Sequence, residues 1–330
     1  MKNNGVFTDM DFEKLKDNKR IDLLADISNQ YYNLGKTQSE IAAYYNTNRF
    51  KIANLLQIAR NEHIVEININ YSNETAPAIE KELMNSFPLK RAIVVDTQFS
   101  PYIDSIRQIG KVGADYINRL IQPASIMGIT WGKTIYSVFS QLQSINHLPV
   151  SIVQLTGSFN CSSPIAESRS LVQLIASAYN GSYYYLDAPL YIKNQKLRDL
   201  FLMEPALQNT ITLSNNMDIV VTGIGGKSSL PITNPRFAPY ITKEELEQEK
   251  NFPGSIYGYV LDSNGSIADI PLNQKLITVP LENIQKTPHR LAVVYGRHKA
   301  EITAKAIQNN LINELLTDTD TARNLLKYAR

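Results

Sequence analysis

The sequence predicts an α/β protein in two parts: an N-terminal all-α helix-turn-helix domain over residues 1–70 and a larger, Rossmann-like, mostly parallel α/β domain over residues 71–330. Two observations carry this prediction. Apolar residues in the first 65 positions recur at helical spacing, whereas from Pro77 onward short β-branched runs alternate with helical patterns. The length of 330 residues agrees with two domains, because a single core seldom grows past about 250 to 300 residues.

Composition limits the class of protein. The chain is 43% hydrophobic and 19% charged, and it contains no run of about 18 apolar residues that could span a bilayer. The first twenty residues carry acids and no apolar stretch, so they do not resemble a signal peptide, and we expect a cytoplasmic protein without a membrane partner. Cys161 is the single cysteine, which excludes an internal disulfide and a cysteine-rich zinc site. We expect the protein to bind no metal and no cofactor. We assign no catalytic role to the thiol of Cys161.

Two helices open the predicted DNA-binding domain. The first is indicated by apolar residues at helical spacing, which are Leu23, Leu24, Ile27, Tyr31 and Leu34. Gly35 ends it. Thr37 then stands as an N-cap with Glu40 three residues later, the pattern of a capping box, and a short second helix follows over residues 38–45.

A third helix is predicted over residues 49–62, after the turn formed by residues 46–48. Its apolar positions are Ile52, Leu55, Leu56 and Ala59, and its polar face offers Arg49, Lys51, Asn54 and Gln57. A short helix, a tight turn and an amphipathic helix make up a helix-turn-helix, whose second helix enters the major groove of DNA. A plain three-helix bundle would show the same periodicity. The stretch after it, residues 64–69, is predicted to be an edge strand or wing, and residues 71–76 a linker.

The second domain is predicted from alternating elements. Strands are expected over residues 91–96, 125–129, 151–155, 218–226, 255–262 and 291–296, and helices over residues 103–121, 133–142, 165–178 and 299–309. This alternation is typical of a mostly parallel sheet covered by helices on both faces. Ligands of such sheets bind at the carboxyl ends of the strands.

Three loops at strand ends are rich in small residues: GITWGKT (128–134), LTGSFN (155–160) and TGIGG (222–226). Together they predict a shared anion pocket, although a single glycine loop is usually only a tight turn. GITWGKT is not a Walker A motif, because only three residues separate its glycines instead of four.

The segment TQSEIAAYYNTNRFKIANLLQIARNEHIVEI resembles the DNA-binding segment of the SorC family of sugar-responsive bacterial regulators. The family's usual Ser and Arg in the recognition helix are here Ala53 and Asn54, so the resemblance implies the same fold and a different operator. Arg suits guanine and Asn suits adenine, which predicts a changed base preference if Asn54 reaches a base edge. The residues expected to contact DNA are Thr37, Gln38, Thr47, Asn48, Arg49, Lys51 and Asn54.

The resemblance to the SorC family covers the rest of the chain. GITWGKT is similar to the family's Gly-Val-Ser-Trp-Gly-Arg-Thr, and LDAPLYI (186–192), DIVVTGIGG (218–226) and residues 293–326 resemble later signatures. The family implies an effector domain related to sugar-phosphate isomerases and deaminases, which binds a phosphorylated sugar and assembles as dimers or tetramers. Carried over, the phosphate contacts fall on Thr130, Gly132, Lys133 and Thr134, with Lys299 as a second positive charge.

The complete set of residues expected to contact the effector is Thr130, Trp131, Gly132, Lys133, Thr134, Gly157, Ser158, Gly223, Gly225, Ser255 and Lys299. Ser255 replaces a family acid that could hold sugar hydroxyls. Trp131 has an alternative role as a core residue, and Lys299 as an ordinary surface lysine.

Three functions are compatible with this sequence. The first is a transcriptional regulator of carbohydrate metabolism whose operator binding changes with the effector. The second is an isomerase or deaminase on the same sugar phosphate, which would need an acid or base in the pocket. The histidines form no pattern with nearby acids, and they are His63, His147, His289 and His298. The third is an architectural DNA-binding protein without ligand response. We expect the regulator, and no enzyme.

Overall fold

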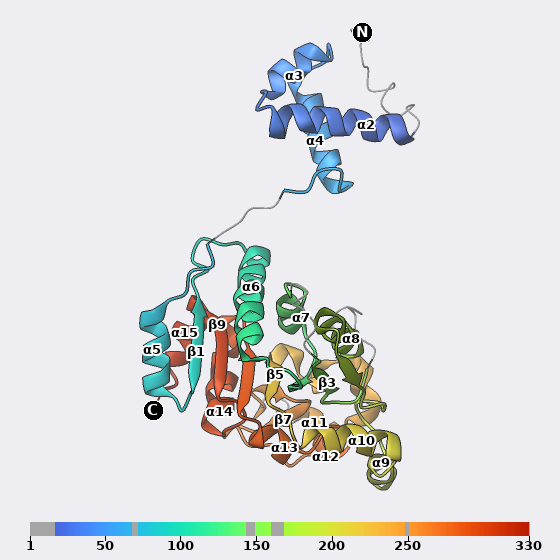
Figure 1. The fold of residues 1–330 in the computed structure, drawn as a ribbon, viewed down its shortest axis with the longest axis vertical. Coiled ribbons are helices and arrows are strands. Elements are labelled where there is room, and N and C mark those ends of the chain that lie inside the picture. Colours follow the sequence, from blue (N-terminus) through green and yellow to red (C-terminus); the bar gives the residue numbers. More distant parts are fainter. Residues whose placement is uncertain (1–16, 68–71, 143–148, 160–167, 248–250, 330) are drawn as a thin grey trace. The chain divides into compact units, whose positions relative to one another are not determined.

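A computed structural model describes residues 17–67, 72–142, 149–159, 168–247 and 251–329. The chain divides into two compact units, Met1–Asn70 and Tyr71–Arg330. Figure 1 traces both along the chain, from the blue helices of the first unit to the red strands and helices at the end of the second. No described helix is long and apolar enough to cross a membrane.

The described part of the N-terminal unit is helical. It contains α2 (Asp17–Ser28), the single π turn η1 (Asn29–Asn33), α3 (Gln38–Tyr44) and α4 (Arg49–Asn61). Its core is formed by apolar side chains that these helices turn inward: Leu24, Ile27, Ile41, Ala42, Ile52, Leu55, Leu56 and Ala59. The four residues predicted as the buried face of the third helix are all in this cluster. The polar positions of α4 are therefore left on the outside.

Side-chain caps fix where α3 and α4 begin. Thr37 and Glu40 form a reciprocal capping box: Oγ1 of Thr37 accepts from the Glu40 amide at 3.2 Å, and the Thr37 amide donates to Glu40 Oε2 at 2.8 Å. The hydrogen bond from the Thr37 backbone lowers the pKa of Glu40. Asn48 caps α4 by accepting the Lys51 amide at 2.9 Å. The turn between the two helices is thus set by local hydrogen bonds.

Replacing Thr37 with Ala should loosen α3, because the Glu40 amide loses its partner at the helix start. We expect a loss of about 1 kcal/mol in the free energy of opening of this unit. Hydrogen exchange of the α3 amides measures it, with Thr47→Ala as control because Thr47 caps neither helix. Equal protection in the two variants would contradict the prediction.

The predicted strand or wing after α4 is wrong where the structure describes it. Residues 64–67 form no strand; instead the amides of Ile64 and Val65 both donate to the carbonyl of Ala59, at 2.9 and 3.2 Å. His63 makes this reversal with a φ of 56°. The two apolar side chains pack against the helical core rather than on a sheet. Residues 68–71 of the predicted strand and linker lie outside the described residues.

The second unit is built on a parallel sheet, as predicted. Seven strands lie in the order β1-β9-β8-β5-β2-β3-β4, all parallel to their neighbours. Their bounds are β1 Arg91–Val95, β9 Glu314–Asp318, β8 His289–Val293, β5 Ile219–Gly226, β2 Ile126–Ile129, β3 Ser151–Gln154 and β4 Ser182–Tyr184. Strands β4 and β9 were not predicted. Strand β9 begins with Glu314 and finishes with Asp318, and these acidic residues are the reason why the sequence pattern does not indicate a strand there.

Helices cover both faces of the sheet because successive residues of its strands are apolar and point to opposite faces. On one side pack α6 (Tyr102–Leu120), α7 (Lys133–Phe139) and α8 (Ser168–Tyr179). The other side carries α5 (Pro77–Ser86), α10 (Pro205–Ser214), α13 (Leu281–Lys286), α14 (Ala300–Gln308) and α15 (Thr319–Leu326). The remaining helices are α9 (Gln195–Leu202), α11 (Lys243–Glu247) and α12 (Pro271–Gln274), with 3-10 turns η3 (Lys227–Ser229), η4 (Pro231–Thr233), η5 (Pro235–Tyr240) and η7 (Arg297–Lys299).

Two predicted elements differ from the structure. The strand expected over residues 255–262 is a hairpin of β6 (Gly254–Ile256) and β7 (Tyr259–Leu261), reversed at Tyr257 and Gly258, which both have positive φ. Strand β6 pairs antiparallel with the end of β5, so the hairpin folds over the carboxyl edge of the sheet. Lys299 ends a 3-10 turn and precedes α14, and the further helix α15 follows; that helix was not predicted.

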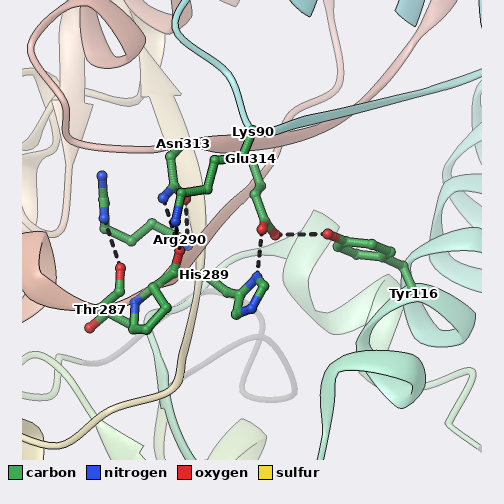
Figure 2. A network of polar contacts seen from close by, with 8 residues as sticks. Lys90, Tyr116, Thr287, His289, Arg290, Asn313 and Glu314 are labelled. Atoms are coloured by element: carbon green, nitrogen blue, oxygen red, sulfur yellow. Dashed lines mark hydrogen bonds and ion pairs between the residues drawn. The ribbon is translucent and has the colours of Figure 1, made fainter.

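The opposite edge of the sheet is occupied by a polar network at the start of β8 and β9 (Figure 2). The buried carboxylate of Glu314 contacts His289 Nδ1 at 2.6 Å and accepts from the Tyr116 hydroxyl at 3.0 Å. Burial, together with Glu314, raises the pKa of Tyr116. The guanidinium of Arg290 donates to three acceptors, the carbonyls of Gln285 and Thr287 and Oδ1 of Asn310. These contacts tie the starts of β8 and β9 to α6 and to the turns beside them, while Nε of Arg290 is buried without a hydrogen-bond partner among the described residues.

Candidate functional site

A cavity of about 710 Å³ lies at the carboxyl ends of β2 and β5. Its lining comes from the loop after β2, the end of β5, the 3-10 turns that follow β5, the β6–β7 hairpin and the segment after β8. This is the position at which open parallel sheets bind ligands. Nine of the predicted effector residues line it: Thr130, Trp131, Gly132, Lys133, Thr134, Gly223, Gly225, Ser255 and Lys299.

The loop after β2 brings backbone donors to the cavity. Gly132 is the N-cap of α7 with a φ of +135°, a conformation that side chains rarely adopt, and a Cβ placed there would meet only open space. The first α7 amide to find a helical acceptor is that of Tyr136, which donates to the Gly132 carbonyl at 2.9 Å. The amides of Lys133 and Thr134 precede it and have no acceptor within the helix. They are available to an anion in the cavity.

Glycines at the end of β5 leave space in the cavity that a side chain would fill. A Cβ on Gly225 would lie 2.9 Å from Ser255 Oγ and 3.2 Å from Ser229 Oγ, so a larger residue would displace these hydroxyls. A Cβ on Gly223 would meet Trp131 O at 3.6 Å and Thr134 Oγ1 at 3.9 Å. The glycines therefore let hydroxyl groups from three segments gather around one space.

Lys299 supplies a positive charge that has no acidic partner among the described residues. Its side chain is half-buried, and burial lowers the pKa of its ammonium group. Among the described residues no hydrogen bond or ion pair is made by its Nζ. The side-chain stem packs beside the end of β5, since a Cβ on Gly226 would lie 3.5 Å from Lys299 Cγ. An unpaired, desolvated cation at a cavity wall favours an anionic ligand.

Aromatic side chains form another wall. Trp131 contacts Phe159 edge-on with ring centroids 5.2 Å apart, and Phe159 contacts Phe237 at 5.4 Å. Trp131 is partly buried against a hydrophobic cluster and also lines the cavity, so the two roles considered for it coexist. The hydroxyl of Thr130 is buried 3.1 Å from that of Thr222 and is already engaged below the surface of the cavity.

Gly157 and Ser158 lie outside this cavity. A Cβ on Gly157 would come within 2.4 Å of the Pro189 carbonyl, and Ser158 exchanges backbone hydrogen bonds of 2.8 Å with Ala188 and Leu190. Ser158 borders a neighbouring hollow of about 780 Å³ instead. This loop is small because another backbone segment passes close to it.

Several lining residues were not predicted: Tyr102, Phe159, Leu190, Ser228, Ser229, Thr233, Asn234, Phe237 and Tyr295. Ser228 and Ser229 directly follow the TGIGG loop, and Tyr295 follows β8, so extending each loop by a few residues would have included them. Tyr102, Thr233 and Asn234 come from segments that carry no strand-end signal.

The residues expected to contact DNA divide into three groups on the N-terminal unit. The side chains of Thr37 and Asn48 cap helices and are bonded to backbone amides. Arg49 and Asn54 are exposed on α4, and the Arg49 guanidinium lies 5.4 Å from the Phe50 ring centre. Gln38, Thr47 and Lys51 are partly buried. No cluster of potential metal ligands occurs in the described ranges.

A helix-turn-helix unit followed by an α/β unit with an anion-favouring cavity defines a class of protein, the ligand-responsive DNA-binding regulators. The family described as "putative sugar-binding domain" matches residues 72–327. Similar proteins include the deoxyribonucleoside regulator of Bacillus subtilis, 24% identical over 94% of this chain and 99% of its own length. The sorbitol operon regulator of Klebsiella pneumoniae is 25% identical over 93% of this chain and 98% of its own.

Solved structures show the same fold. The full-length sorbitol operon regulator SorC from Klebsiella pneumoniae superposes with a TM-score of 0.69 at 23% identity, over 93% of this chain and 98% of that one. A transcriptional regulator from Streptococcus pneumoniae superposes with a TM-score of 0.70 at 22% identity, over 76% and 96%. The chain belongs to the SorC family of transcriptional regulators with a sugar-binding domain. The predicted resemblance and the prediction of a regulator rather than an enzyme are confirmed by this family.

Proposed function

We propose that this chain binds operator DNA through the exposed face of α4 and that a phosphorylated sugar in the cavity of the second unit changes this binding. The phosphate is inferred from the half-buried ammonium group of Lys299, which has no acidic partner in the part of the chain that the structure describes. A phosphate dianion would compensate this charge and accept hydrogen bonds from the amides at the start of α7.

The remainder of the cavity suits a polyol. Hydroxyl and amide groups line the side formed by the 3-10 turns and the hairpin, and they are Ser228, Ser229, Thr233, Asn234 and Ser255. Trp131 and Phe237 present apolar surface against which the carbon face of a sugar ring can pack. Ser255 can donate as well as accept, whereas the ionised acid of the family pattern only accepts, so this position suits a different arrangement of sugar hydroxyls.

Regulation requires that the sugar phosphate bind two states of the protein with different affinity. We propose that the chain acts in the cytoplasm as a symmetric homodimer or homotetramer, because helix-turn-helix proteins pair two half-sites of an operator. The proposal that a sugar compound regulates DNA binding is supported by the names of two relatives, a deoxyribonucleoside regulator and a sorbitol operon regulator.

Thermal melting of the full chain against a panel of sugars and their phosphates tests the ligand class. A ligand that binds only the native state adds about 2.7 kcal/mol of stability at a hundredfold excess over its dissociation constant. We expect one sugar phosphate to raise the melting temperature while the same sugar without phosphate, and inorganic phosphate alone, raise it much less. An equal rise in melting temperature with the sugar that lacks phosphate would contradict the proposed phosphate contact. No rise with any compound of the panel would contradict the proposal that the ligand is a sugar phosphate.

A further inference from the structure

Helix α9 has an exposed apolar face. Leu197, Leu200 and Met203 are 50%, 61% and 69% exposed, and no residue of α9 is fully buried. The helix lies at the periphery of the second unit beside α10 (Figure 1). Its opposite side is attached to the unit by Phe201 and Leu202, which pack against the core. At least half of the surface of each of these residues is therefore left uncovered within one chain.

These side chains lie on one stripe. Leu197 and Leu200 are three residues apart, and Met203 follows three residues later as the C-cap of the helix. Arg198, on another face, donates to the Leu276 carbonyl at 3.0 Å and pairs with Asp199 at 2.9 Å. A contiguous apolar stripe on an otherwise attached helix is the kind of patch that marks a protein–protein contact.

Charged residues of opposite sign lie at the two ends of the stripe. Lys193 and Lys196 lie at its N-terminal end and Glu204 directly after its C-terminal end, all exposed and without an ion-pair partner among the residues described. A base in the first turn of a helix is unfavourable to that helix, whereas Glu204 is the N-cap of α10, where an acid is favourable. Bases at one end of the stripe and an acid at the other are complementary to an antiparallel copy of the same stripe, which brings opposite charges together at both ends.

We propose that α9 packs antiparallel against α9 of a second copy of this chain, with the two-fold axis passing at Leu200. The spacing supports this register: Leu197 and Met203 are each three residues from Leu200, and Lys196 and Glu204 are each four. A two-fold contact must be self-complementary, so each residue on one side meets its counterpart from the other. Leu197 then meets the partner's Met203, and Lys196 meets the partner's Glu204, twice in each dimer. The proposal specifies the surface through which the proposed oligomer forms, and so rests on that function.

Charge reversal tests the register. In the full chain, Lys196→Glu places like charges together twice and should weaken self-association about tenfold or more, measured by sedimentation equilibrium. Glu204→Lys should do the same, and the double variant should restore association because both pairs are re-formed with exchanged signs. Lys81→Glu, an exposed lysine of α5, is the matched control and should leave association unchanged. Unchanged association in the single variants, or no rescue in the double variant, would overturn the proposal. Unchanged self-association is also the result expected if this face of α9 binds a different protein, so that outcome too overturns the proposal.

A cross-link tests the axis independently. In a Cys161→Ser background, Leu200→Cys should form a disulfide-linked dimer under mild oxidation, because the two thiols face each other on the axis. Ile103→Cys, equally exposed on α6, is the control and should remain monomeric on a non-reducing gel. A dimer at position 103 and none at 200 would overturn the proposal. The shift in melting temperature with the sugar phosphate is measured on every variant. A variant chain that shows the shift but no cross-link at position 200 rejects only the α9 contact. If no sugar phosphate shifts the melting temperature of the unmodified chain, only the ligand is rejected.

Discussion

Replacing Lys299 with Met should lower the affinity for the sugar phosphate about 10- to 100-fold and should at the same time stabilise the ligand-free protein. The first effect follows because a hydrogen bond to a charged group contributes about 1.5 to 3 kcal/mol. The second follows because the half-buried ammonium group has no partner in the described structure, so its desolvation is not compensated. Met keeps the apolar stem that packs beside Gly226.

The stabilisation should depend on pH with a defined sign. Burial lowers the pKa of Lys299, so the native state binds this proton less tightly than the unfolded state does. The cost to stability is fully present below the folded-state pKa and decreases as pH rises through the interval between that lowered pKa and the ordinary lysine value. The advantage of Lys299→Met over the unmodified chain should therefore shrink as the pH rises from the lowered pKa of Lys299 toward the ordinary lysine value.

Isothermal titration calorimetry with the sugar phosphate from the melting panel measures the affinity, and urea unfolding of the ligand-free chain measures the stability. Lys81→Met serves as the control, because Lys81 is an exposed lysine outside the cavity. An unchanged affinity in Lys299→Met would place the phosphate elsewhere. A loss of stability in the ligand-free variant would show that Lys299 has a stabilising partner.

Replacing Arg49 with Ala should weaken operator binding about 10- to 100-fold, since a good bidentate contact to a base contributes roughly 1 to 3 kcal/mol. Arg49 is the first residue of α4, exposed beside Phe50 and directly after the Asn48 cap. Recognition helices contact base edges with their N-terminal residues. The substitution should leave the cap, and with it the fold, intact.

Fluorescence anisotropy with operator and with random DNA at two salt concentrations measures the contribution. A loss confined to the operator indicates base recognition, whereas a uniform loss with a reduced salt slope indicates a phosphate contact. Arg60→Ala is the control, because Arg60 is equally exposed at the C-terminal end of α4 and should matter less. Equal losses for Arg49 and Arg60 would mean that α4 does not enter the groove with its N-terminus.

The local elements could be predicted because their causes are local. The capping box of Thr37 and Glu40, the cap of Asn48 and the buried stripe of α4 depend on residues three and four apart in the sequence. The same holds for the loop after β2, whose glycine and lysine sit together in one motif. The parallel sheet followed from the alternation of strands and helices along the chain, because each of these elements is recognised from the periodicity of its own few residues.

Long-range packing decided the rest. Strand β9 lies inside the sheet, between β1 and β8, and the pairing with β1 joins segments far apart in the chain. Its terminal residues are acidic, so its own sequence does not indicate a strand. Gly157 has the composition of a ligand loop, yet Pro189 passes too close for a side chain, and the ligand cavity lies elsewhere. Conversely, Tyr102, Thr233 and Asn234 enter the cavity from segments without a ligand signal. The sequence by itself determined the class of the two domains and the helix-turn-helix, because short-range periodicity and caps specify them. Only the tertiary structure decided which side chains share the cavity, because that set is chosen by contacts between residues that are distant in the chain.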